Sequence, residues 1–119
     1  MSSLFNTTIH PSGVLIYSLS GQLLSAETAD QMVRQADNDL EKGKKRFIVD
    51  ISKLEHVNSS GLNCLLRTFT KIRNKGGESV ILNPSTSVKK LLEISKLNTV
   101  FRIETNEESA LQHLTAHEA

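Results

Sequence analysis

An almost wholly apolar run at residues 47–51, set between two amphipathic segments, constrains the fold of this chain more than any other feature. The run Phe-Ile-Val-Asp-Ile is typical of a central strand that is covered on both faces. Apolar residues recur at positions 26, 29, 33, 36 and 40 before it, and at positions 62, 65, 66, 69 and 72 after it. Each set marks one face of a helix. A covered strand between two such helices predicts an α/β fold.

The flanking segments extend this alternation of strands and helices. Residues 5–9 and 14–19 are predicted strands joined by a turn at Pro11-Ser12-Gly13, so the chain opens with a hairpin that Gly21 ends. Gly76-Gly77 closes the second helix, and a strand is predicted at 79–82. The next predicted helix runs through Val88, Leu91 and Leu92 and is capped by Ser85 or Thr86. A strand at 100–103 and a terminal helix capped by Asn106 complete the predicted elements. We therefore expect a single-domain α/β fold: a mixed, mostly parallel sheet of four to five strands with about four helices packed on it.

The length of 119 residues suits one domain, which we expect to occupy residues 1–119 with a core at about 4–115. The residues from His113 to Ala119 are predicted to be an untethered tail. Hydrophobic residues make up 38% of the chain, which supports a modest core and no membrane span. The N-terminus has no positive region followed by an apolar stretch, so no signal peptide is predicted. We expect a cytoplasmic protein that is a monomer or a weak dimer.

The charge balance limits the kinds of partner. The chain has 14 Lys and Arg against 13 acidic residues, a net charge of +1, which argues against nucleic acid as the main partner. We also expect no membrane as a partner. The longest basic cluster, residues 42–46, is interpreted as a solvated loop between a helix and a strand. The single cysteine, Cys64, permits no internal disulfide and is interpreted as a small buried hydrophobe.

The turn Asn58-Ser59-Ser60-Gly61 is the main candidate site. It joins the carboxyl end of the third predicted strand to the start of the second helix, and open α/β sheets bind ligands at that edge. A helix start offers unpaired backbone N–H groups and the positive end of a dipole, so a phosphate on Ser59 is favoured there. The same residues also suit a plain helix cap with a tight turn at Gly61. Local sequence does not decide between these two interpretations.

The chain carries a wider set of motifs at a specific spacing: Asp50-Ile51-Ser52, Asn58-Ser59-Ser60-Gly61-Leu62, Gly76-Gly77, Val88-Lys89-Lys90-Leu91 and Leu97. This pattern resembles the STAS domains of bacterial anti-sigma-factor antagonists. The hairpin and the first helix match in order and length, so the resemblance covers nearly the whole chain. It implies a STAS-like fold and a protein that acts by reversible binding rather than as an enzyme, with no cofactor.

The resemblance also implies a partner-switching mechanism. The unphosphorylated protein binds an anti-sigma factor that is also a serine kinase, phosphorylation of Ser59 releases it, and a serine phosphatase resets it. Asn58, Ser60 and Gly61 are expected to neighbour the phosphate, and the contact surface is expected to include Gln22, Asn63 and Arg67 on this chain. Asp50 is either a further neighbour of the phosphate or an acceptor for local hydrogen bonds.

Two departures from the family pattern concern acidic residues. The family usually has Asp just before the acceptor serine, where this chain has Asn58, and often has Gly-Glu-Leu-Asp where this chain has Gly21-Gln22-Leu23-Leu24. A kinase that depends on those carboxylates would dock differently. The alternative is therefore a STAS module that regulates another signalling or transport complex without phosphorylation.

Two further classes of function fit less well. A nucleotide-binding domain lacks its usual signals, since the chain has neither a Walker loop nor a GxGxxG fingerprint. A serine hydrolase would need a G-x-S-x-G elbow and a base, and His56 is the only histidine near Ser59 in sequence. The two nearby acidic residues, Asp50 and Glu55, are too few to hold a metal ion.

Overall fold

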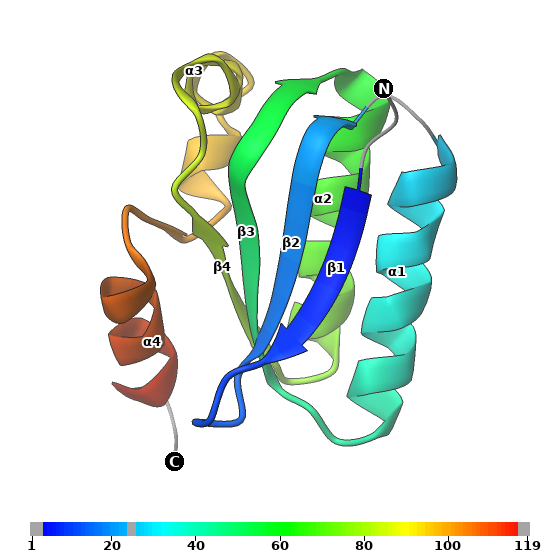
Figure 1. The fold of residues 1–119 in the computed structure, drawn as a ribbon, viewed down its shortest axis with the longest axis vertical. Coiled ribbons are helices and arrows are strands. Elements are labelled where there is room, and N and C mark those ends of the chain that lie inside the picture. Colours follow the sequence, from blue (N-terminus) through cyan, green and yellow to red (C-terminus); the bar gives the residue numbers. More distant parts are fainter. Residues whose placement is uncertain (1–3, 24–25, 117–119) are drawn as a thin grey trace.

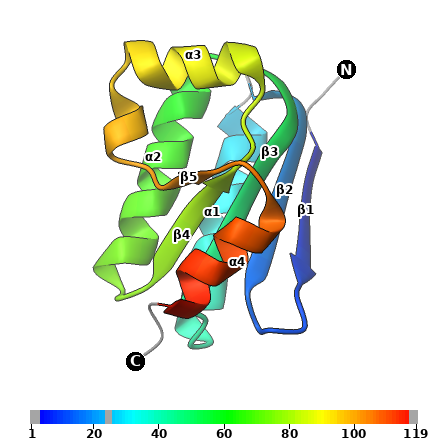
Figure 2. The ribbon, with the colours of Figure 1, turned by 90° about the vertical axis from the view of Figure 1, so that its left-hand side faces the viewer.

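The computed structural model describes residues 4–23 and 26–116, which form one sheet with helices on both of its faces (Figures 1 and 2). Within these residues the strand order is β1-β2-β3-β4-β5, in which β1 pairs antiparallel with β2 and all other neighbours are parallel. The elements are β1 (Leu4–Ile9), β2 (Leu15–Leu23), α1 (Ala26–Glu41), β3 (Arg46–Val57), α2 (Ser59–Asn74), β4 (Glu78–Leu82), α3 (Thr86–Ile94), the 3-10 helix η1 (Leu97–Thr99), β5 (Ile103–Glu104) and α4 (Glu107–Ala116). The predicted mixed, mostly parallel sheet with four helices is confirmed.

The helices divide the core into two layers. α1 and α2 cover one face of the sheet, α4 covers part of the other, and α3 lies across the end at which β3 finishes (Figures 1 and 2). The larger cluster, on the α1 and α2 side, includes the fully buried side chains of Tyr17, Met32, Phe47, Leu65 and Ile72. The smaller cluster, beneath α4, consists of Val14, Ile48, Val80, Leu82, Ala110 and Leu114. Because β3 contributes Phe47 to one cluster and Ile48 to the other, its predicted burial on both faces is confirmed.

Local hydrogen bonds define the helix ends that the sequence predicts. After α1, Gly43 has a φ of +88° and donates its N–H to the Leu40 carbonyl at 3.0 Å. Ser85 caps α3 by accepting from the Val88 N–H, and Asn106 Oδ1 accepts from the Ser109 N–H at 2.8 Å before α4. These contacts confirm the predicted stop and caps.

Two strands are longer than the sequence pattern predicts. β2 continues to Leu23, and β3 continues to Val57 because its second half pairs with the end of β2. The prediction that Gly21 ends the second strand is therefore wrong. Gly21 has a φ of +81° and lies at a register shift between β2 and β3, an irregularity that glycine accommodates without steric strain.

Side chains from the start of α3 complete β3 where β4 has ended. β4 pairs with β3 only as far as Asp50. Beyond that point the Ser85 hydroxyl donates to the Leu54 carbonyl at 3.1 Å, and the Ser87 hydroxyl donates to the Glu55 carbonyl at 3.2 Å. These bonds engage β3 carbonyls beyond the last residue that pairs with β4. They hold the carboxyl end of β3, and with it the turn that follows.

The C-terminal region is more ordered than the sequence suggests. The prediction of an untethered tail from His113 is wrong as far as Ala116, because α4 continues to that residue. Leu114 is fully buried, and His113 Nε2 lies 3.2 Å from Glu78 Oε2. Residues 117–119 of the predicted tail lie outside the described residues. The predicted strand at 100–103 is reduced to β5, because η1 precedes it and Phe101 turns into the core.

Candidate functional site

The Asn58–Gly61 segment forms a capped helix start at the carboxyl end of β3. Asn58 has an extended backbone conformation, and its Oδ1 accepts from the Gly61 N–H at 2.9 Å. The Asn58 carbonyl accepts from the Leu62 N–H at 2.9 Å. Both oxygens of Asn58 therefore bind the first turn of α2, while Gly61 is buried beneath it. The structure confirms the predicted cap and identifies Asn58 as the residue that makes it.

Ser59 and Ser60 occupy the first two positions of α2, and both are exposed. Within the part of the chain that the structure describes, neither hydroxyl has a hydrogen-bond partner. The first turn of α2 contains no acidic residue, so no carboxylate of this turn offsets the positive end of the helix dipole. An anion added at Ser59 would meet this positive end directly, which is a favourable position for a phosphate.

The predicted contact residues lie around this turn. Asn63 and Arg67 are exposed and follow Ser59 at intervals of four residues, so the three lie along one face of α2. Gln22 is the partner of His56 in the β2–β3 ladder, two residues before Asn58, so its backbone also lies at this edge. Leu24, the other position that departs from the family pattern, lies outside the described residues.

A small cavity beside the turn was not anticipated from the sequence. It has a volume of about 190 Å³ and lies between the end of β3 and α3. Its lining residues are Glu55, His56, Val57, Ser87, Val88 and Leu91. The Ser85 and Ser87 hydroxyls, which follow Pro84, were the sequence signal that could have indicated this cavity, but only the fold shows that they bind the backbone of β3.

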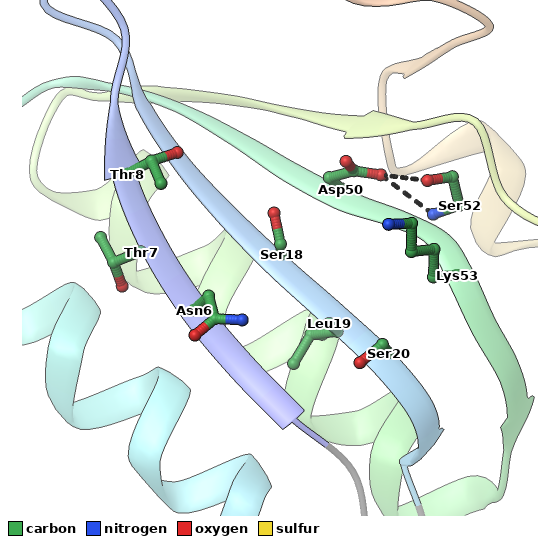
Figure 3. Close-up of a pocket in the computed structure, with 9 residues that line it drawn as sticks. All are labelled: Asn6, Thr7, Thr8, Ser18, Leu19, Ser20, Asp50, Ser52 and Lys53. Carbon is green, nitrogen blue, oxygen red and sulfur yellow. Dashed lines mark hydrogen bonds between the residues drawn. The ribbon is translucent and has the colours of Figure 1, made fainter.

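Asp50 does not lie at the Ser59 turn. Its Oδ1 accepts from the Ser52 backbone N–H at 3.0 Å and from the Ser52 hydroxyl at 2.7 Å (Figure 3). It precedes the end of β3 by seven residues, which is roughly 20 Å of extended chain. Of the two interpretations of Asp50, the structure supports the acceptor of local hydrogen bonds.

A depression of about 560 Å³ lies over β1, β2 and β3, and Asp50 is one of its lining residues. The lining residues are Asn6, Thr7, Thr8, Ser18, Leu19, Ser20, Asp50, Ser52 and Lys53 (Figure 3).

Other reactive groups do not join the turn. Cys64 is buried as predicted, and this burial raises the pKa of its thiol. His10 lies in the β1–β2 connection and His113 beside Glu78, whereas His117 is outside the described residues. Within residues 4–23 and 26–116, no three His, Cys, Asp or Glu side chains gather as a metal-binding group. In the same residues no helix has the length and hydropathy needed to cross a membrane.

The fold and the exposed turn define a single-domain α/β module that presents a serine at the carboxyl edge of its sheet. The chain belongs to the STAS domain family, whose model matches residues 6–110. It is 33% identical over 106 residues to an anti-sigma F factor antagonist of Paenibacillus polymyxa, an alignment that covers 88% of this chain and 90% of that protein.

Solved structures show the same fold. An anti-sigma factor antagonist from Mycobacterium paratuberculosis matches with a TM-score of 0.80 at 20% identity, covering 96% of this chain and 95% of that one. Unphosphorylated SpoIIAA matches with a TM-score of 0.73 at 18% identity, covering 94% and 98%. Phosphorylated SpoIIAA, from Bacillus, matches with a TM-score of 0.72 at 22% identity, covering 92% and 98%.

Proposed function

We propose that this protein is a cytoplasmic anti-sigma-factor antagonist that acts by partner switching at Ser59. Its unphosphorylated form binds an anti-sigma factor that is also a serine kinase. Transfer of a phosphate to Ser59 releases that partner, and a serine phosphatase restores the binding form. In this mechanism Ser59 is the substrate of another enzyme, and the protein itself is not a catalyst.

The observation that carries the proposal is the exposed, unengaged hydroxyl of Ser59 at the start of α2, within a turn that matches the family motif. Similarity to a protein named an anti-sigma F factor antagonist supports the choice of partner. SpoIIAA, which shares the fold, has been solved in phosphorylated and unphosphorylated forms.

The geometry makes a local switch sufficient. The turn is fixed by the Asn58 cap and by α2, which packs on the sheet through Leu65, Phe69 and Ile72. A phosphate on Ser59 adds about −1.5 to −2 charges at the centre of the proposed contact surface. Burying such a charge without a partner costs roughly 3–5 kcal/mol, or a factor of hundreds to thousands in affinity. Release therefore needs no refolding of the domain.

The absence of acidic residues from the turn bears on the kinase. Asn58 keeps the cap that an Asp would make but carries no carboxylate to polarise the Ser59 hydroxyl. A kinase that acts here must supply that group itself. The same feature favours the second candidate function, a STAS module that binds its partner without phosphorylation.

A pair of serine variants separates these two functions. The first measurement is the intact mass of the protein purified from its own cells, with fragmentation to place any phosphate. We expect a phosphate in the wild type and in Ser60→Ala, the matched control, and none in Ser59→Ala. A kinase that co-purifies with the wild-type protein and phosphorylates Ser59 would be identified as the anti-sigma-factor partner.

Binding of that kinase provides the second test. We expect Ser59→Asp to weaken binding and Ser59→Ala to preserve it, while far-UV circular dichroism shows that both variants are folded. Equal binding by the wild type and Ser59→Asp would reject the switch. Absence of phosphate across growth and stress conditions would favour the phosphorylation-independent module.

A further inference from the structure

A group of basic side chains lies at one end of this molecule. Five basic side chains gather at the end opposite the Ser59 turn: three in the α1–β3 connection, one at the start of β3 and one at the C-terminal cap of α2. We call this group the basic end; it consists of Lys42, Lys44, Lys45, Arg46 and Lys75. Figure 1 shows the α1–β3 and α2–β4 connections together at the lower end, beside the β1–β2 hairpin, whereas β3 enters α2 at the upper end. The long axis of the molecule measures 37 Å.

Specific contacts hold these segments together. The Lys45 Nζ donates to the Lys75 carbonyl, and the Lys45 carbonyl accepts from the Glu78 N–H at 2.7 Å. The Arg46 guanidinium lies beside Gly13 of the β1–β2 hairpin. The basic end is therefore a fixed feature of the fold, built from segments about 30 residues apart in sequence.

Neighbouring carboxylates offset only part of this charge. Asp39 is buried and accepts from the Tyr17 hydroxyl at 2.6 Å, and Glu78 lies 3.2 Å from His113. Glu41 is an exposed carboxylate at this end. The C-terminal dipoles of α1 and α2 favour a cation in each last turn, but two helix ends do not account for five basic residues. The five basic residues of the basic end thus outnumber these three carboxylates.

A large exposed aliphatic residue lies beside the basic end. Ile9, at the end of β1, is 64% exposed. It pairs with Leu15, which pairs with Phe47, the residue after Arg46. Two strand spacings separate Ile9 from Phe47, which is about 10 Å. An aliphatic side chain next to several lysines is the combination that binds at the interface of an anionic bilayer.

In contrast to the expectation from the sequence that no membrane is a partner, we propose that the basic end docks on an anionic phospholipid surface, with Ile9 entering the headgroup region. The aromatic side chains that single-stranded nucleic acids stack on are buried or half-buried in this chain; they are Phe5, Tyr17, Phe47, Phe69 and Phe101. Four of the five basic residues are lysines, which carry compact point charges, and this suits a lipid surface. Docking through this end leaves the Ser59 turn facing away from the membrane and open to a protein partner. The inference does not depend on the proposed function.

Co-sedimentation of the full chain with phospholipid vesicles tests this proposal. We expect binding to vesicles that contain phosphatidylglycerol, little binding to pure phosphatidylcholine, and loss of binding as salt is raised. Each basic residue near such a surface contributes roughly fivefold to partitioning, so the double variant Lys42→Gln, Lys44→Gln should bind roughly 25-fold more weakly. The matched control is Lys89→Gln, Lys90→Gln, an exposed lysine pair on α3 at the other end, which should bind like the wild type. Ile9→Thr, which keeps a β-branched residue in β1, should also weaken binding.

The outcomes are distinct. Equal losses in the two lysine double variants would overturn the proposal, because attraction would then be general rather than located at the basic end. Failure of the wild type to bind phosphatidylglycerol vesicles at low salt would also overturn it. Binding to polyglutamate or to DNA but not to vesicles would do the same, since the basic end would then serve an acidic polymer. Phosphate transfer to Ser59 is measured separately and is expected to be unchanged in all these variants.

Discussion

Substituting Asn58 by alanine tests the structural basis of the serine turn. The Asn58 side chain accepts from the Gly61 N–H at 2.9 Å, and alanine removes that acceptor while leaving the backbone bond from Leu62. Loss of an N-cap costs about 1 kcal/mol, within a range of roughly 0.5–2 kcal/mol. The rest of α2 is held by buried side chains, so only its first turn should loosen. We expect the free energy of unfolding to fall by about 1 kcal/mol.

Urea unfolding followed by far-UV circular dichroism measures this loss, and the chain has no tryptophan whose fluorescence would serve instead. Amide hydrogen exchange should be faster at residues 60–62 and unchanged near Ile72, at the far end of α2. The matched controls are Asn58→Asp, which retains the acceptor and should be at least as stable as the wild type, and Asn63→Ala, which removes an exposed side chain outside the cap. If Asn58→Ala were as stable as Asn58→Asp, the cap would contribute nothing and the argument for a rigid turn would be wrong.

Two further predictions concern the rest of the fold. Leu114→Ala should lower the free energy of unfolding by about 3 kcal/mol, because Leu114 is a fully buried residue of α4 that packs in the smaller core cluster. A loss under about 1 kcal/mol in urea would mean that α4 is not part of the cooperative fold. Burial, together with the hydrogen bond to Asp39, raises the pKa of Tyr17 above its ordinary value near 10, so the folded state keeps the proton that the unfolded state loses. This stabilisation is complete below about pH 10 and is lost as the pH rises further. Tyr17→Phe should lack that alkaline loss of stability. Urea midpoints measured from about pH 8 to 11 that fall equally in the wild type and in Tyr17→Phe would contradict the raised pKa of Tyr17.

Much of the fold follows from local pattern. The periodicity of apolar residues predicts α1, α2, β3 and β4, since each buries a regular stripe or run against the sheet. The caps at Ser85 and Asn106 were also predictable, because side-chain acceptors before a helix act within three residues. The second half of β3 was not, because its polar residues become a strand only by pairing with β2 and accepting bonds from Ser85 and Ser87.

The candidate site divides in the same way. Asn58, Ser59, Ser60 and Gly61 are consecutive, so their proximity and the helix start they form are consequences of sequence alone. Asp50 belongs to the motif that precedes the turn in sequence, yet an extended strand carries it far from Ser59. Local sequence indicates hydrogen-bonding capacity, but the length of a strand decides which groups meet.

The amino-acid sequence by itself determined the α/β class, the family resemblance and the placement of a serine turn at a helix start, because each depends on contacts or periodicities within a few residues. Only the tertiary structure decided that Gln22 lies beside the end of β3 and that α4 covers the second face of the sheet. It also brought Lys75 to Lys45 and so added a fifth basic residue to the cluster that the sequence places at residues 42–46. These arrangements depend on register and crossover between strands, which bring together residues that are far apart along the chain.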